Sequence, residues 1–66
     1  MTQRELVRAH LESGKPLTPL EALNDYGCFR LAARIEELRK MGLGIKTTMI
    51  TKGGRAFAQY KMEEAA

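Results

Sequence analysis

The sequence has a single cysteine, a single histidine and a single serine among its 66 residues. These three residues are far apart in the chain, so neither a nucleophile–base pair nor a cluster of metal ligands is indicated. One cysteine also excludes a disulfide within the chain, which is typical of a reducing compartment. We therefore expect no enzyme activity, no catalytic residues, no bound metal and no cofactor.

Long apolar runs are missing as well. No stretch approaches the ~20 consecutive apolar residues of a membrane helix, and the segment MTQRELVRAH lacks the apolar core of a signal peptide. We expect a cytoplasmic protein with no membrane partner. A chain this short buries only about 60% of its unfolded surface, which leaves no deep cavity for a small-molecule substrate. We expect one domain over residues 1–62 and a disordered acidic tail over residues 63–66.

Positive charge is concentrated in the second half of the chain. Residues 1–27 carry three cations and four anions, whereas residues 28–62 carry eight cations and two anions. A sequence pI of about 9.4 with clustered lysine and arginine is the footprint of a nucleic-acid-binding protein. A polyanionic partner is therefore indicated.

Two helices are predicted in the first half of the chain. Thr2 and Glu5 fit a capping box, and the apolar spacing after them predicts a helix over about residues 3–12. His10 lies beside the apolar stripe of this helix. We interpret it as a structural residue, because no second metal ligand is near it in sequence.

The second helix is predicted over about residues 19–25. Thr18 is its N-cap, Pro19 occupies the first helical position, and a glutamate follows three residues after the cap. Leu20 and Leu23 are expected to face the core. The next segment, Asn-Asp-Tyr-Gly, supplies the turn chemistry that ends the helix.

A third, longer helix is predicted over about residues 28–41. Leu31, Ile35 and Leu38 follow the spacing of a buried face, and Gly42 is expected to end the helix in the left-handed conformation. The opposite arc, at about 100° per residue, carries Phe29, Ala33, Glu36, Glu37 and Lys40, with Arg30 beside them.

The hydrophobic period then changes to that of a hairpin. Residues 45–50 predict a strand, residues 51–55 a glycine turn, and residues 56–61 the returning strand. Ile45, Tyr60 and Met62 are expected to face the helices, which leaves Phe57 on the other side. The fold class is mostly α with a small β-hairpin, a three-helix winged helix-turn-helix in the order ααα-ββ.

This order of elements predicts binding of double-stranded DNA, with the third helix in the major groove and the hairpin as a wing on the backbone. Arg30 is the main base-contact candidate, because a guanidinium can pair with two acceptors of guanine. Because so small a module makes few contacts, we expect a homodimer or a larger protein complex. The other base-contact candidates are Phe29, Ala33 and Glu37, and the phosphate candidates are Thr18, Arg34, Lys40, Lys46, Lys52 and Arg55.

Two assignments on the third helix stay open at this point. Arg34 can contact a phosphate or form an ion pair with Glu37 or Glu21. Glu36 and Glu37 would repel phosphates unless they pair with Lys40 or accept from a cytosine amino group.

Much of the chain resembles a family of short helix-turn-helix domains found in phages and prophages. The resemblance covers about residues 17–62 and is carried by LTPLEAL, GCFRLAARIEELRKMG, IKT and FAQYKM. It implies a winged-helix fold and DNA binding as a transcriptional regulator or phage DNA-transaction accessory in a bacterial cytoplasm. Gly44 stands where the family often has proline, and Gln59 where its second strand is more cationic, which implies a looser and less basic wing.

A protein-interaction module is the alternative function. Glu36, Glu37 and an uncovered Phe57 favour it, because an exposed aromatic side chain is a plausible anchor for a partner. The winged helix would then bind a host or phage protein in place of DNA.

Overall fold

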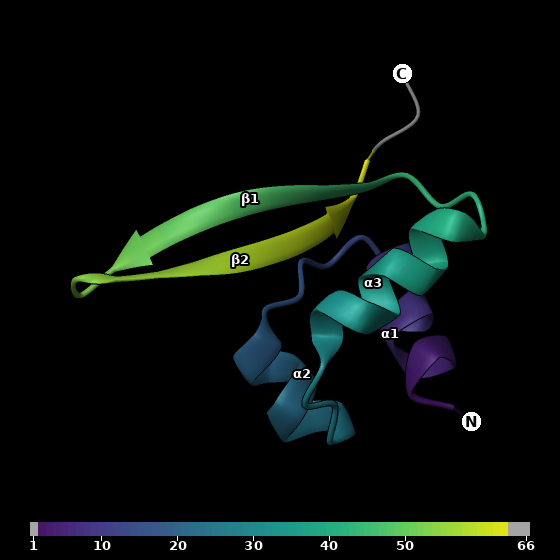
Figure 1. Cartoon of the computed structure of the whole chain (residues 1–66), viewed down its shortest axis with the longest axis horizontal. Coiled ribbons are helices and arrows are strands. Elements are labelled where there is room, and N and C mark those ends of the chain that lie inside the picture. The colour runs from purple at the N-terminus through teal and green to yellow at the C-terminus, as the bar shows by residue number, and fades with distance from the viewer. Residues whose placement is uncertain (1, 64–66) are drawn as a thin grey trace.

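A computed structural model describes residues 2–63 of the chain and contains three helices followed by a two-stranded antiparallel hairpin (Figure 1). The predicted ααα-ββ order is confirmed. The expected acidic tail, residues 63–66, lies outside the described residues apart from Glu63. The elements are α1 (Gln3–Glu12), α2 (Pro19–Tyr26), α3 (Leu31–Lys40), β1 (Ile45–Lys52) and β2 (Arg55–Met62).

The core lies where the three helices meet the base of the hairpin. Leu31, Ile35 and Leu38 of α3 are buried, as the apolar spacing predicted. Burying a side chain of this size contributes about 1.5–3 kcal/mol. No helix among residues 2–63 is long and apolar enough to cross a bilayer. The other buried members of the cluster are Val7, Leu11, Leu17, Ala22, Cys28, Ile45 and Tyr60.

His10 connects α1 to α2 and to the linker between them. Its Nε2 lies 2.9 Å from the Pro16 carbonyl oxygen, and its Nδ1 lies 2.7 Å from the Tyr26 hydroxyl. Because a carbonyl only accepts, Nε2 donates to Pro16, and Nδ1 forms the second hydrogen bond with the tyrosine hydroxyl. Both ring nitrogens are used within the fold, which agrees with the structural role predicted for this residue.

α2 turns a different face to the core from the one predicted. The capping box at Thr18 is present, but Leu20 and Leu23 are 66% and 36% exposed, and Ala22 is fully buried. The prediction of inward-facing leucines is wrong, because Leu17 and Ala22 pack on either side of the cap and fix the rotation of the helix. Leu20 then lies about 200° around the helix from the buried alanine.

The hairpin turns at two glycines and is anchored by the linker between α1 and α2. Gly53 and Gly54 have φ of 61° and 78°, the two positive values of a tight type I′ turn. At the base, Leu17 and Tyr60 exchange two backbone hydrogen bonds of 2.8 Å each. No strand was predicted between the first two helices. This pairing fixes the base of the hairpin on the helical body, and the rest projects beyond the helices (Figure 1).

Candidate nucleic-acid interface

α3 begins at Leu31, three residues later than predicted. The backbone before it is committed elsewhere: Gly27 ends α2 at φ 63°, and the Cys28 amide donates to the Ala22 carbonyl at 3.1 Å. The Cys28 side chain is also buried in the core. A residue held in this way cannot form the first turn of the next helix, so the prediction of a helix from about residue 28 is wrong at its start.

The later start places the two leading base-contact candidates in a loop at the beginning of α3. Arg30 is the N-cap residue, with ψ of 62°, and its side chain is exposed. Phe29 is 85% exposed. Within residues 2–63, the Arg30 guanidinium forms no ion pair. The loop therefore presents an unpaired cation and an uncovered aromatic ring side by side in sequence.

Arg34 and Glu37 pair with each other on the surface of α3. The arginine Nε lies 2.9 Å from Oε1, without hydrogen-bond geometry, and Nη2 donates to Oε2 at 3.3 Å. Of the alternatives open for Arg34, this is the contact observed. The two side chains are 30% and 41% exposed, and an ion pair this accessible contributes only about 0–1 kcal/mol. A phosphate or a base edge can therefore compete for either partner.

Arg39 fastens the end of α3 to the start of β1, a role that the sequence did not predict. Its Nη2 donates to the Ile45 carbonyl at 2.9 Å and to Thr47 Oγ1 at 2.7 Å. Its Nη1 also lies 3.6 Å from Glu36 Oε1. Glu36, like Glu37, thus has an arginine partner on α3. Lys40, the partner expected for the two glutamates, is exposed and pairs with neither of them in the described part of the chain.

The remaining helix candidates occupy two different positions. Ala33 is half-buried on the side of α3 opposite its apolar stripe, where a small side chain allows close approach to α3. Thr18 Oγ1 donates to Glu21 Oε1 at 3.0 Å and accepts from the Glu21 amide at 3.2 Å. The only hydroxyl proton of Thr18 is therefore used in the cap, and a phosphate here would meet backbone amides of the first turn of α2.

The strand register places all four cations of the hairpin on one face. Residues directly opposite each other in an antiparallel pair share a face, and the faces alternate along each strand. Lys46 is opposite Lys61, and Lys52 is opposite Arg55. The other face carries no charged residue, and at its base Ile45, Tyr60 and Met62 contact the core, as predicted.

These opposed cations create a local electrostatic cost. Like charges directly opposite each other destabilise a sheet, and none of the four has an ion-pair partner among residues 2–63. The two pairs are about 20 Å apart, at about 3.3 Å per residue. A polyanion along this face would relieve both repulsions. Lys61 was not among the predicted site residues, although a two-residue turn at Gly53 and Gly54 fixes its pairing with Lys46.

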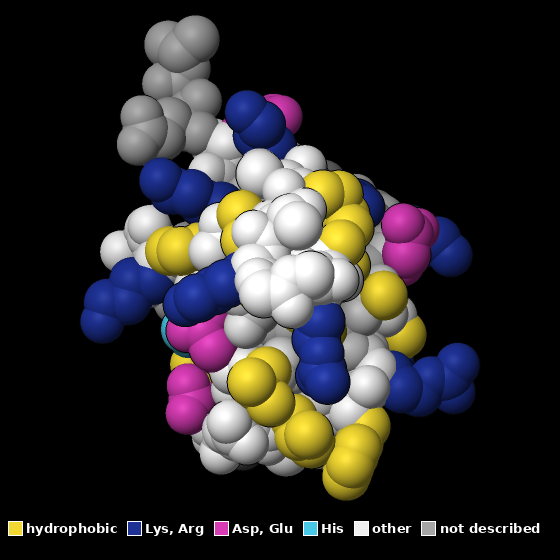
Figure 2. All heavy atoms as spheres, turned by 90° about the vertical axis from the view of Figure 1, so that its left-hand side faces the viewer, with side chains coloured by type: hydrophobic (Ala, Val, Ile, Leu, Met, Phe, Trp, Pro, Cys, Tyr) yellow, Lys and Arg dark blue, Asp and Glu magenta, His cyan; other side chains and the backbone are white. Residues whose placement is uncertain are grey.

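The end of the molecule that carries the hairpin tip combines cations and apolar side chains. Figure 2 shows Lys and Arg side chains spread around the hairpin, and hydrophobic side chains gathered below it. The large apolar residues exposed in α2 and in the loop after it are Leu20, Leu23 and Phe29.

Comparison with known protein families matches residues 2–65 to the winged helix-turn-helix domain. No curated protein matches the chain. No solved structure matches it either. The family match spans all three helices and the hairpin.

Proposed function

Because the chain belongs to the winged helix-turn-helix domain family, we propose that it binds double-stranded DNA through the start of α3 and the tip of the hairpin. The observation that carries this proposal is a group of exposed cations at α3 and on the wing that have no carboxylate partner among residues 2–63: Arg30, Lys40 and the two opposed pairs of the wing. Phosphates supply the counter-charge that the described part of the chain does not.

The base contacts are proposed at the junction between the loop and α3. Arg30 pairs with the O6 and N7 acceptors of a guanine, and Phe29 contacts a thymine methyl group in the major groove. Ala33 lets the helix approach the bases. Glu37 accepts from a cytosine amino group when Arg34 moves from it to a phosphate.

The phosphate contacts are proposed around this junction. Lys52 and Arg55 reach the backbone from the hairpin tip, and Lys40 does so from the end of α3. Thr18 marks the start of α2, where backbone amides can meet a phosphate. Lys46 lies at the hairpin base, on the face that carries Lys61. Phosphate contacts fix position and affinity, while the junction sets sequence preference.

The test is selection from a pool of random duplexes at two salt concentrations, followed by sequencing of the bound fraction. We expect affinity to fall steeply as salt rises, because bound phosphates release counterions. We also expect the bound fraction to be enriched in a short motif that contains guanine. An affinity that does not change with salt would overturn duplex recognition.

The biological role is proposed as a transcriptional regulator or a phage DNA-transaction accessory in a bacterial cytoplasm. One module this small buries little surface on DNA, so tight binding requires a homodimer or a larger complex on adjacent half-sites. Sedimentation of the protein with a selected duplex measures this directly, and we expect two chains per site. A single chain per site at saturation would contradict the dimer.

The second candidate function is docking of a host or phage protein. It is favoured by the exposed apolar residues Leu20 and Leu23, which are neighbours on α2 at a spacing of three. A pull-down from nuclease-treated extract separates the two functions. A partner that survives nuclease and is lost with Leu20→Ser supports docking, and loss of every partner with nuclease counts against it.

A further inference from the structure

We propose that the outer face of the hairpin binds single-stranded nucleic acid, at a site separate from the start of α3. The outer face consists of the even-numbered residues 46–52 of β1 and the odd-numbered residues 55–61 of β2, which share one side of the ribbon. This inference goes beyond duplex binding and does not depend on it. The outer face shares Lys46, Lys52 and Arg55 with the proposed duplex interface, and it differs from that interface by Phe57 and Lys61.

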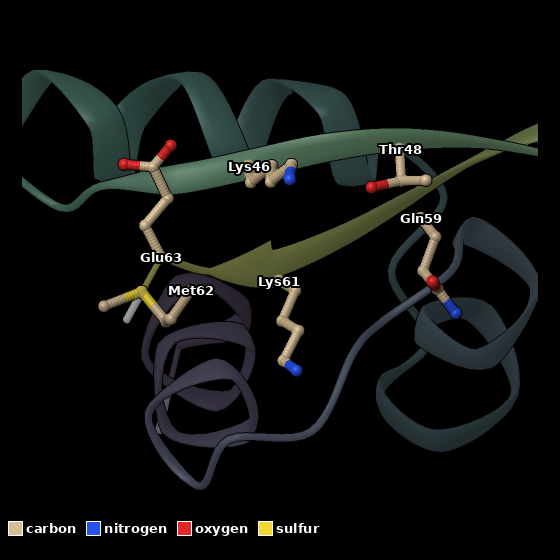
Figure 3. Close-up of a pocket in the computed structure, with 6 residues that line it drawn as sticks. All are labelled: Lys46, Thr48, Gln59, Lys61, Met62 and Glu63. Carbon is tan, nitrogen blue, oxygen red and sulfur yellow. The ribbon is translucent and has the colours of Figure 1, made fainter. Parts of the chain in front are cut away.

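At the hairpin base, the outer face lies on the side opposite the helices. Ile45 and Tyr60, on the inner face, are buried in the core, and Arg39 of α3 donates to Thr47 on the same inner face. The helices therefore pack against the inner face at the base. Figure 3 shows Lys46 and Thr48 on β1 and Gln59 and Lys61 on β2, with a helix passing behind β1.

The base of the outer face is a shallow cationic hollow. Lys46 and Lys61 face each other across the strands, with Thr48 and Gln59 as the next pair, and these residues line a hollow of about 390 Å³ (Figure 3). Glu63 stands at one end, with its carboxylate beside Gly44. It pairs with neither lysine within the described residues.

The middle of the outer face is apolar, and its tip is cationic again. Ile50 and Phe57 are opposite each other and are both half-buried. Beyond them a groove of about 480 Å³ runs between the hairpin tip and the start of α2, with Leu20 and Phe57 in its wall and Lys52 and Arg55 beside them. No residue that lines this groove is acidic.

This pattern fits a single strand better than a duplex. A duplex keeps its bases paired and stacked on one another, so no base face is free to lie on the Phe57 ring. A single strand can place phosphates on the cations at both ends and stack a base on the Phe57 ring. Aromatic stacking within a positively charged groove is the usual basis of sequence-tolerant single-strand binding.

The experiment measures fluorescence anisotropy of labelled dT12 and of a labelled duplex with the full chain at low salt. We expect Phe57→Leu, which keeps the aliphatic bulk, to weaken dT12 binding by about 5- to 150-fold and to leave duplex binding unchanged. The double variant Lys46→Ala/Lys61→Ala should weaken dT12 binding and flatten its salt dependence by about 1.4 in slope.

Two matched controls make the result decisive. Met49→Ala changes a 64% exposed residue of the inner face and should leave dT12 binding unchanged. Arg30→Ala should weaken only the duplex. Circular dichroism melting of each variant confirms that it is folded.

Four results would overturn the outer-face site. Three of them are no saturable dT12 binding at low salt, equal dT12 affinity of Phe57→Leu and the parent chain, and displacement of dT12 by polyglutamate of matched charge. Equal losses of duplex and dT12 binding in Arg30→Ala would also overturn it, because they indicate one shared site. If the parent chain binds dT12 but does not bind the duplex, the proposed function is contradicted and the outer-face site is still supported.

Discussion

Three arginines at or within α3 have three different surroundings, and these decide what each residue can do. The Arg39 guanidinium is held by the Ile45 carbonyl and Thr47, so it is a structural tie. The Arg34 guanidinium lies in a half-exposed pair and is exchangeable. Arg30 is exposed and has no ion-pair partner within residues 2–63. Only the last is ready to contact a ligand without first breaking a contact.

Replacing Arg30 with alanine should therefore affect binding and spare stability. We expect the duplex affinity to fall by about 1–3 kcal/mol, with relaxed preference at one base pair. The free energy of unfolding should stay within about 0.5 kcal/mol, because an exposed side chain without partners is removed. Binding isotherms on the selected site and on single-base variants, with urea unfolding in parallel, measure both. An equal loss of affinity for every duplex sequence would indicate that Arg30 contacts a phosphate and not a base.

Replacing Arg39 with alanine should show the reverse pattern. It removes charge-assisted hydrogen bonds that join α3 to β1, and we expect the free energy of unfolding to fall by about 1–3 kcal/mol. Lys40→Ala is the matched control, since it removes a neighbouring cation that is exposed. Urea unfolding of the two variants gives the comparison. If both variants unfold at the same denaturant concentration as the parent chain, the Arg39 hydrogen bonds do not contribute to stability.

At the scale of elements, local signals predicted the boundaries that local chemistry sets. The cap at Thr18 and the turn at Gly53-Gly54 act within a few residues, and both are observed. The predicted rotation of α2 and the predicted start of α3 were wrong, because both depend on tertiary contacts of Ala22 and Cys28. The β-bridge between Leu17 and Tyr60 pairs residues far apart in sequence, so no local sequence pattern predicts it.

The hairpin itself allows a test of the conflict between stability and binding. Lys61→Glu converts a repulsive cross-strand pair with Lys46 into an attractive one, and we expect the free energy of unfolding to rise by about 0.2–1 kcal/mol. The same change should weaken binding of dT12. Lys61→Gln removes the repulsion without adding attraction, so its free energy of unfolding should lie between those of the parent chain and Lys61→Glu. A hairpin whose stability does not respond to either change would show that Lys46 and Lys61 do not interact.

At the scale of the whole molecule, the charge distribution was predictable, but its geometry was not. Composition showed that positive charge lies in residues 28–62. Only the register shows that the hairpin cations share one face, and only the packing shows that Arg34 and Arg39 are engaged by Glu37 and Glu36. Within residues 28–62, the cations without ion-pair partners therefore lie on the hairpin and at the two ends of α3, in Arg30 and Lys40.

The unpaired cations of the hairpin lead us to a prediction about the salt dependence of duplex binding by the whole chain. Lys52 is an exposed cation at the hairpin tip, and we propose that it contacts a phosphate. Lys52→Ala should then reduce the slope of log affinity against log salt by about 0.9 and weaken all duplex sequences equally.

Lys15→Ala is the control for this measurement, because it removes an equal charge from an exposed position in the linker between α1 and α2. If duplex DNA responded only to net charge, both variants would lower the slope by the same amount. If the hairpin tip lies on the backbone, only Lys52→Ala lowers it. Titrations at four or more salt concentrations distinguish the two, and an unchanged slope in Lys52→Ala would remove the hairpin tip from the duplex interface.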